Sequence, residues 1–220
     1  MVATERQNPQ PKGGAKGRPK GRPRGFDRET ALERALTLFW EYGYEATSVS
    51  NLTKAMGINP PSLYAAFGDK RSLFEEAVER YQETHGAFTP RALHEEPTAR
   101  GAIHRMLREA AVEFTDDSHP GGCLIVSAAV NCGPESSDVE AHLRDIREAG
   151  KQSMRDRIAS GIHTGELPPD TDADALGAYF AAVFQGMSTQ ARDGASRTEL
   201  EAMAELAMRA WPEPAHTASA

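Results

Sequence analysis

This 220-residue chain contains two cysteines with a histidine nearby, and such side chains can bind a metal or act as nucleophiles. Thiolates close to a histidine could form a metal or redox sensor, and His119 precedes Cys123 and Cys132. The cysteines are nine residues apart, unlike the compact Cys-x-x-Cys pairs of metal sites. No acid, glycine elbow or phosphate loop accompanies Cys123 as a nucleophile. We therefore predict no catalytic residue, no metal and no cofactor, and keep sensing through Cys123 as an alternative.

A second group of polar residues, from Thr47 to Lys70, has the pattern of two short helices joined by a tight turn. Thr47 or Ser48 can cap the first helix, because a hydroxyl oxygen accepts a hydrogen bond from an unpaired backbone N–H. Gly57 can end that helix, since glycine adopts the left-handed conformation at low cost. Asn59 can then cap the second helix. Such a helix-turn-helix can place its second helix in the major groove of DNA.

The sequence GINPPSLYAAFGDK, which ends at Lys70, resembles the recognition region of the TetR family of bacterial transcriptional regulators. The family pattern has a glycine with a small apolar residue, a serine, Leu-Tyr, a phenylalanine three residues later, and a lysine after a turn. Every element is present in this chain. The strong resemblance covers about residues 26–78, and the remainder resembles the family only in its helical layout. The pair Pro60-Pro61 is a feature of a subgroup.

This resemblance implies which residues contact DNA. Base contacts are expected at the exposed start of the second helix, where proline can offer only shape and methyl contact. Hydroxyls and helix N-termini are suitable donors to phosphate groups. Two assignments have alternatives, since Tyr64 could be a core aromatic residue and Lys70 a solvated surface lysine. The expected DNA-binding residues are Asn59, Pro60 and Pro61 for bases, Thr47, Ser48, Ser62, Tyr64 and Lys70 for phosphates, and Arg22 and Arg24 in the N-terminal arm.

Charge is divided unevenly along the chain, whose net charge is −7. Residues 1–25 hold seven Lys or Arg residues against one Glu, so this arm carries +6 and the remainder −13. The arm has almost no large apolar side chain and is predicted to be disordered. Its repeated Gly-Arg-Pro resembles an AT-hook, in which Arg22 and Arg24 would enter a narrow A·T minor groove. The alternative is a solvated tail that contacts phosphates without sequence preference.

The composition favours an all-α fold, because apolar residues recur at helical spacing and alternating apolar runs are scarce. No apolar run approaches the roughly 20 residues that a membrane-spanning helix needs, and no secretion signal is visible. Two cysteines are too few for a disulfide framework, so we expect a cytoplasmic protein without a membrane partner. The predicted parts are a disordered basic arm (1–25), a three-helix helix-turn-helix DNA-binding domain (26–71), a helical effector-binding and dimerisation domain (72–212) and a disordered tail (213–220).

Local patterns also predict the individual helices. Within the DNA-binding domain, helices are expected over 27–42, 47–57 and 59–67, followed by a longer helix over 69–86. Beyond it we expect a loop over 87–96, a helix capped by Thr98, a short buried helix over 123–133, and helices opened by Ser137, Asp172 and Thr198.

The resemblance implies that the second domain binds an effector and pairs with another copy of the chain. One helix-turn-helix makes too few contacts for a typical specific affinity of about 10⁻⁸–10⁻¹¹ M, so two copies on a pseudo-palindromic operator are expected. The candidate pocket residues are Phe114, Cys123, Leu124, Ser127, Tyr179 and Phe184, for each of which core packing is the alternative. The candidate dimer residues are Ile146, Met154, Phe180, Val183 and Met187.

The predicted function is therefore that of a homodimeric DNA-binding regulator, a repressor that a small-molecule effector releases from its operator. The effector would act by preferring the geometry that does not bind DNA, with a coupling energy of typically about 1–3 kcal/mol. The rival from another class is an architectural protein that binds A·T-rich DNA through its basic arm. Such a protein would bind many A·T sequences with steep salt dependence, whereas a regulator discriminates one palindrome.

Overall fold

The computed structural model describes residues 27–128, 130 and 132–213, which contain helices and no strand. The predicted basic arm, with Arg22 and Arg24, and nearly all of the predicted C-terminal tail lie outside these residues. None of the described helices is long and apolar enough to cross a membrane. The helices are α1 (Arg28–Ala46), α2 (Val49–Met56), α3 (Pro60–Phe67), α4 (Lys70–Glu83), α5 (Phe88–Glu95), α6 (Ala99–Glu113), α7 (Leu124–Ser127), α8 (Ser137–His163), α9 (Ala173–Arg192) and α10 (Arg197–Ala207).

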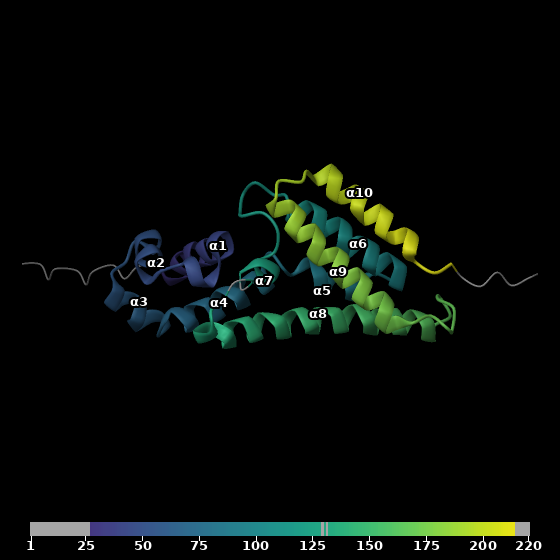
Figure 1. Cartoon of the computed structure of the whole chain (residues 1–220), viewed down its shortest axis with the longest axis horizontal. Helices are drawn as coiled ribbons and strands as arrows, with labels where there is room; N and C mark the ends of the chain where they lie inside the picture. The colour runs from purple at the N-terminus through teal and green to yellow at the C-terminus, as the bar shows by residue number, and fades with distance from the viewer. Residues whose placement is uncertain (1–26, 129, 131, 214–220) are drawn as a thin grey trace, which may run out of the picture.

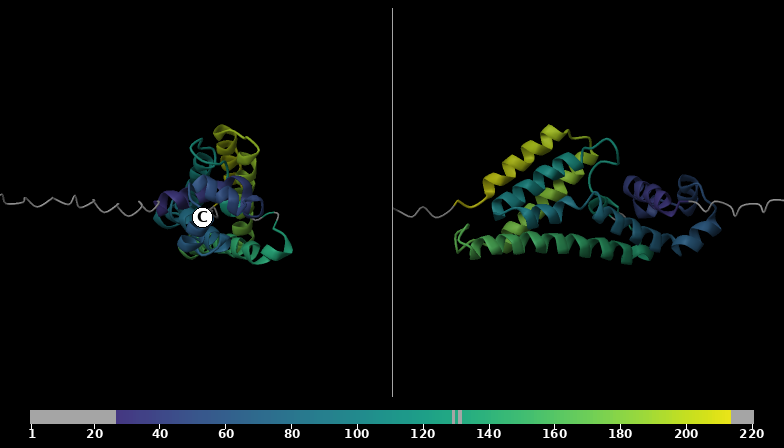
Figure 2. Two further views of the ribbon diagram at one scale, coloured as in Figure 1. Left: turned by 90° about the vertical axis from the view of Figure 1, so that its left-hand side faces the viewer. Right: turned by 180° about the vertical axis from the view of Figure 1, so that it is seen from behind.

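The helices form two units along one long axis, and α4 leads from one unit to the other (Figure 1). The first unit, which we call the head, contains α1, α2 and α3. The second unit, which we call the body, contains α5 to α10. Figure 2 shows the same arrangement from behind, with α8 extending along one side of the body. The predicted all-α fold with an N-terminal helix-turn-helix is confirmed.

The helices of the head begin at the capping residues that the sequence indicates. Ser48 caps α2 in a capping box with Asn51, and the Asn59 side chain accepts a hydrogen bond from the Ser62 N–H at 2.9 Å at the start of α3. Asp27 caps α1, whose backbone leaves the helical conformation at Gly43, with φ of 78°. Because these caps are local hydrogen bonds, a short stretch of sequence is enough to indicate them.

Two predictions for the body are wrong about helix extent. Residues 88–95 form α5 instead of a loop, because Pro90 lies in the first turn, where a missing N–H removes no hydrogen bond within the helix. The predicted helix over 123–133 is much shorter, since α7 has four residues. Val130 beyond it is 70% exposed, so the uncharged stretch is only partly buried.

Two predicted caps are also in the wrong register. α8 begins at Ser137 directly after a 3₁₀ turn at Pro134–Ser136, so Ser137 is already helical and forms no capping box. α10 is capped by Ser196 with Glu199, two residues before the predicted Thr198. Two overlapping Ser/Thr-x-x-Glu patterns occur there, and local sequence alone does not distinguish them.

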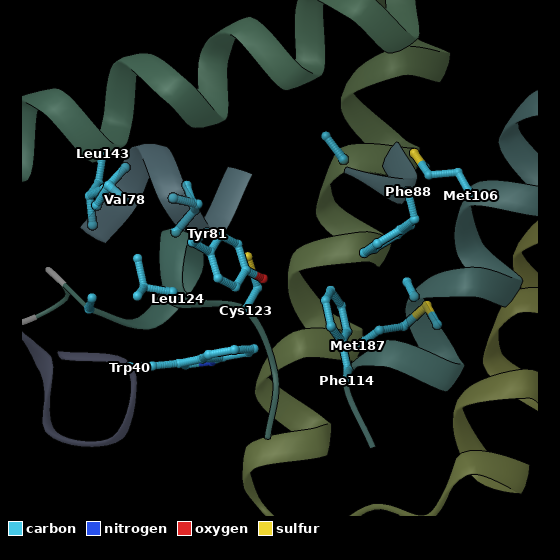
Figure 3. Packing of buried hydrophobic residues seen from close by; sticks show 14 of the residues in the cluster. Trp40, Val78, Tyr81, Phe88, Met106, Phe114, Cys123, Leu124, Leu143 and Met187 are labelled. Atoms are coloured by element: carbon cyan, nitrogen blue, oxygen red, sulfur yellow. The ribbon is translucent and has the colours of Figure 1, made fainter. Parts of the chain in front are cut away.

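Trp40 of α1 packs where the head meets the body. Its side chain is fully buried, and its ring meets the Tyr81 ring of α4 edge to face with 4.8 Å between centroids. It also stacks on His119 with 4.5 Å between ring centroids. Figure 3 shows Trp40 beside Tyr81, with Phe114 further into the body. Truncation of such a residue to alanine typically costs about 3–5 kcal/mol, so this contact contributes strongly to holding the two units together.

At two glycines in the body, two segments of backbone pack unusually close together. At Gly177 in α9, an added Cβ would lie 3.2 Å from the Cα of Arg155, so the backbones of α8 and α9 pack closely there. At Gly122, before α7, an added Cβ would lie 2.5 Å from the Ser188 carbonyl oxygen in α9. The second approach positions the loop that leads to α7 against α9.

Gly122→Ala tests how firmly that loop is held. Gly122 has φ of +76°, and Gly165 has the same φ with no atom within 4 Å of an added Cβ. We expect Gly122→Ala to lower the free energy of unfolding by about 2–4 kcal/mol and Gly165→Ala by about 1 kcal/mol, because only Gly122→Ala adds a backbone clash to the left-handed strain. Urea denaturation of both variants measures the difference. Equal reductions would show that the clash is relieved at little cost.

Candidate nucleic-acid interface and effector cavity

The outer face of α3 is exposed at the end of the molecule farthest from α10 (Figure 1). Leu63 and Phe67 are buried against the rest of the head, whereas Asn59 and the two prolines that follow it face solvent. Tyr64 is 49% exposed, so the alternative that it is a core aromatic residue is wrong. Its contact with a phosphate group stays a prediction.

The start of α3 has no free backbone N–H. Pro60 and Pro61 lack this donor, and the Ser62 N–H donates to the Asn59 side chain at 2.9 Å. The Leu63 N–H donates to the Asn59 carbonyl oxygen at 3.1 Å. Anion binding at a helix N-terminus depends on unpaired N–H groups, and this helix offers none there. If α3 contacts an anion such as a phosphate, the contact must therefore come from side chains.

Thr47 is a correction to the predicted phosphate contacts. Its side chain is 1% exposed, and its hydroxyl donates to the Gly43 carbonyl oxygen at 2.7 Å. The hydroxyl therefore stabilises the break at the end of α1 and is not available to a phosphate. The exposed hydroxyl of Ser48 caps α2 instead. The N–H groups of Val49 and Ser50, the first two residues of α2, have no hydrogen-bond partner in the described part of the chain.

Lys70 lies at the turn between α3 and α4 and is partly buried. Its ammonium group is 4.1 Å from the centre of the Tyr44 ring, a cation–π distance. Burial lowers the pKa of Lys70 below its usual value, and the charge of Glu45 opposes that shift. The alternative of a freely solvated lysine is therefore wrong. Contact between Lys70 and a phosphate stays a prediction.

Arg28 holds α3 in position, and sequence reasoning missed it. Its guanidinium donates to the two carboxylate oxygens of Glu76 in α4 at 2.7 and 2.8 Å. It also donates to the Ala66 carbonyl oxygen near the end of α3 at 3.3 Å and lies 4.4 Å from the centre of the Phe67 ring. A cation is favourable at a helix C-terminus. Arg28 and Ala66 are 38 residues apart, so no local pattern could indicate the contact.

The end of α1 is hydrogen-bonded to the body. Arg192 in α9 donates to the carbonyl oxygens of Trp40 at 2.9 Å and Glu41 at 2.8 Å. The Tyr44 N–H donates to the Ala128 carbonyl oxygen, just after α7, at 2.9 Å. A displacement of α7 or α9 would therefore act directly on α1.

A cavity of about 330 Å³ lies in the body, bordered by the end of α4 and by α5, α7, α8 and α9. Most of its wall is apolar. Arg147 and Lys151 from α8 line it, and none of the described acidic residues does. The volume is within the range of small-molecule sites, which have apolar walls and a few polar groups.

Cys123 and Phe184 are the candidate pocket residues that line this cavity. Burial raises the pKa of the Cys123 thiol above its usual value. Burial likewise raises the pKa of Cys132. The thiols therefore stay protonated near neutral pH, and protonated thiols are weak nucleophiles and weak metal ligands. Their surroundings give no support to sensing through Cys123.

The other four candidate pocket residues do not border this cavity. Phe114 and Leu124 are fully buried and do not line the cavity. The Ser127 hydroxyl donates to the carbonyl oxygen of Cys123 at 2.9 Å, and Tyr179 is 41% exposed on the outside of α9. Helical periodicity indicates which residues are buried but not which buried face borders a cavity.

Three candidate dimer residues are also corrected. Met154, Phe180 and Met187 are 3%, 0% and 0% exposed within one chain, so another subunit cannot contact them. Ile146 and Val183 are partly buried, and Ile146 lines the cavity. The wide apolar arc of α9 faces its own chain over these positions. Apart from Tyr179, the exposed apolar residues of α9 are alanines, whose hydrophobic signal in the sequence is weak.

Two family models match the chain. Residues 31–77 match the model described as bacterial regulatory proteins of the tetR family. Residues 97–207 match the model described as the tetracyclin repressor-like C-terminal domain. The first match covers most of the head and α4, and the second covers most of the body.

Two of the curated relatives that the chain matches are named as repressors. The HTH-type transcriptional repressor ComR of Escherichia coli (strain K12) is 34% identical over 188 residues, which cover 85% of this chain and 90% of ComR. The HTH-type transcriptional repressor BdcR of the same organism is 31% identical over 179 residues, with 81% and 86% covered.

Solved structures with the same fold include two close in sequence. The TetR family transcriptional regulator CifR, as a cysteine mutant complexed with 26-bp double-strand operator DNA, is 46% identical with a TM-score of 0.84. The match covers 87% of this chain and 100% of that of CifR. A putative TetR transcriptional regulator from Rhodococcus sp. RHA1 is 42% identical with a TM-score of 0.58, covering 83% and 98%.

Arg28→Lys tests whether this guanidinium positions α3. Arg80→Lys is the matched control, because Arg80 also joins α4 to α1, through Glu33 at 2.6 Å, without touching α3. Lysine keeps the charge but lacks the planar guanidinium that contacts Glu76, the Ala66 carbonyl oxygen and the Phe67 ring together. We expect amide hydrogen exchange in α3 to become roughly 3- to 10-fold faster in Arg28→Lys and to stay unchanged in Arg80→Lys. Equal exchange in the two variants would assign the position of α3 to packing alone.

Proposed function

Because the chain belongs to the TetR family of bacterial regulatory proteins, we propose that it is a repressor that binds a pseudo-palindromic operator as a homodimer and is released by a small molecule. The observation that carries this proposal is the exposed outer face of α3 in a helix-turn-helix whose relative CifR is bound to operator DNA. A role in DNA binding without catalysis, in the cytoplasm, is part of the proposal.

The proposed base contacts come from the first turn of α3. The side-chain oxygen of Asn59 is occupied as a cap, but its amide NH₂ group remains a donor for base edges. Pro60 and Pro61 present carbon atoms to the groove, which suits thymine methyl groups. Sequence would then be read through one amide, methyl contacts and the shape of the DNA.

The proposed phosphate contacts surround this turn. Ser48, Ser62, Tyr64 and Lys70 keep this role. In place of Thr47, we assign one phosphate to the free N–H groups at the start of α2, where the helix dipole also favours an anion. Of these phosphate-binding groups, only the Lys70 side chain carries a full positive charge.

The basic arm is proposed to supply most of the attraction to DNA. Residues 26–71 contain five basic and six acidic residues, for a net charge of −1, whereas residues 1–25 carry +6. Neutralised phosphates dominate DNA affinity and its salt dependence. A head with no net positive charge therefore needs the arm, with Arg22 and Arg24 in or near the minor groove.

The cavity in the body is the proposed effector site. Its apolar wall, with Arg147 and Lys151 and no acidic residue, suits a small molecule with an apolar body and an anionic or hydrogen-bond-accepting end. Tyr81 and Gln82 at the end of α4 line the same cavity. An effector that displaces them would move α4, and α4 directly follows α3. This continuity gives a physical route from effector binding to the DNA-reading helix.

The proposed dimer interface is the outward face of α9, together with α8. Tyr179 and Ala182 are exposed, and an added Cβ at Gly186 meets no atom within 4 Å. Small residues let the backbone of another helix approach closely. These positions replace the buried Met154 and Phe180 as the expected contacts.

Binding of the purified protein to a fragmented genomic library, followed by sequencing, tests the function. We expect the full chain to enrich one palindrome and the variant that lacks residues 1–25 to enrich the same palindrome more weakly. The dependence of log K on log salt should be shallower without the arm, by about 0.9 for each phosphate that the arm neutralises.

Two variants separate the possible roles of the arm. If Arg22→Ala with Arg24→Ala removes a preference for A·T flanks, the arm enters the minor groove, and a uniform reduction of affinity assigns it to phosphates. Broad A·T-rich enrichment that disappears with the arm would contradict the repressor and favour the architectural alternative.

Gly186→Leu tests the dimer interface. Gly150→Leu is the matched control, because Gly150 is also helical with no atom within 4 Å of an added Cβ, but it lines the cavity. Both replacements favour the helical conformation by roughly 1 kcal/mol, so neither is expected to unfold the chain. We expect sedimentation to show a monomer for Gly186→Leu and a dimer for Gly150→Leu. Dimers of both variants would place the interface elsewhere.

A further inference from the structure

Two histidines and a glutamate converge beside Trp40, where the head meets the body. His85 lies in the turn after α4, Glu113 ends α6, and His119 lies in the loop before α7. One ligand atom from each of the three lies within 4.8 Å of the other two. We propose that these side chains bind a divalent transition-metal ion, with Zn²⁺ as the best fit. This site is separate from the effector cavity and goes beyond the proposed function.

The hydrogen bonding of His119 supports a cation at this place. Its Nδ1 lies 3.1 Å from the Pro120 carbonyl oxygen, and its Nε2 lies 3.2 Å from Oε1 of Glu113. A neutral imidazole has one N–H and can donate to only one of these two acceptors. When Nδ1–H donates to Pro120, the lone pair of Nε2 faces a carboxylate oxygen. A metal ion between the two atoms turns this repulsion into coordination by both.

The contact with Pro120 also fixes the orientation of the His119 ring, in the way that is usual for metal-binding histidines. Such histidines donate their second ring N–H to a backbone carbonyl or a carboxylate, which sets the tautomer and the orientation. His119 has this partner already, and its side chain is 8% exposed. Its Nε2 is therefore presented toward Glu113 as a ligand atom.

The spacing of the ligand atoms suits a small ion. His85 Nδ1 lies 2.8 Å from Glu113 Oε1, and His119 Nε2 lies 3.2 Å from the same oxygen. Ligand atoms around a tetrahedral Zn²⁺ with bonds of about 2.0–2.1 Å are roughly 3.3 Å apart, so each nitrogen needs to move only slightly away from this oxygen. Two imidazoles and a carboxylate favour Zn²⁺ over Mg²⁺ or Ca²⁺, which prefer oxygen ligands.

Trp40 forms the wall behind the two histidines. Its ring stacks on His119 with 4.5 Å between centroids, and the ring of His85 lies 5.0 Å away. These contacts restrict rotation of both rings and exclude water from that side. His85 and Glu113 are 29% and 27% exposed, so an ion can enter from solvent on the other side. Among the described residues neither thiol belongs to this cluster, which separates it from the sensing role considered for Cys123.

The position of the cluster connects three segments of the chain. An ion there would tie the end of α4 to α6 and to the loop before α7. Metal binding would therefore restrain α4, the helix that leads from the DNA-reading head. If it alters the DNA affinity, DNA must alter the metal affinity by the same factor.

Titration of the chelator-treated full chain with Co²⁺, followed by displacement with Zn²⁺, tests the proposal. We expect a visible absorption band that saturates at one equivalent, a Zn²⁺ dissociation constant on the order of 10⁻⁶ M or below, and a higher melting temperature with Zn²⁺. Glu113→Gln and His85→Gln should each weaken Zn²⁺ binding by at least about 10-fold. The two variants provide independent tests, so a folding defect in one leaves the other informative.

His104→Gln is the matched control. His104 pairs with Glu205 at 2.8 Å, a histidine–carboxylate contact like those of the cluster, and among the described residues no third ligand joins this pair. Its Zn²⁺ affinity should equal that of the unmodified chain. Equal affinities in Glu113→Gln and His104→Gln, or no Co²⁺ band in the full chain, would overturn the proposal.

Discussion

The burial of Trp40 between α4 and the loop before α7 is the packing contact that joins the DNA-reading head to the body. Its indole N–H has no hydrogen-bond partner among the described residues, so the ring is held by packing, which includes contacts with the rings of Tyr81, His85 and His119. Protein interiors are close-packed, and a shift of one such element leaves a void or a clash. The head therefore has few positions relative to the body, and the carbonyl of Trp40, bonded to Arg192, belongs to the same junction.

α4 connects this junction and the cavity to the helices of the head. At its start Lys70 contacts the Tyr44 ring, and Glu76 holds Arg28 and through it α3. At its end Tyr81 borders both Trp40 and the cavity. The helix has 14 residues and so spans about 21 Å. Since a helix of this length behaves as a nearly rigid rod, a small displacement at the cavity becomes a change in the orientation of the head.

The sequence predicts the features of this fold that depend on neighbours in the chain. The cap at Asn59 and the break at Gly43 are local, and both occur where the residue types indicate them. The burial of Thr47 depends on tertiary packing, and the contact between Arg28 and Glu76 spans 48 residues, so neither follows from a local pattern. The position of the cavity is harder to predict from the sequence, because it depends on how residues from several helices pack together. Family resemblance supplies the expectation that a cavity exists but not its walls.

The two prolines that open α3 have a consequence for how the protein would choose among DNA sites. With no free N–H at that turn, the start of α3 would contact the bases of a DNA groove mainly through carbon. Added salt weakens contacts with phosphates, which any sequence offers, but leaves apolar contacts with particular bases largely intact. Discrimination between the operator and other DNA should therefore sharpen as ionic strength rises, even while the total affinity falls. In a genome with many non-specific sites, the salt content of the cell would itself improve the binding specificity of this protein.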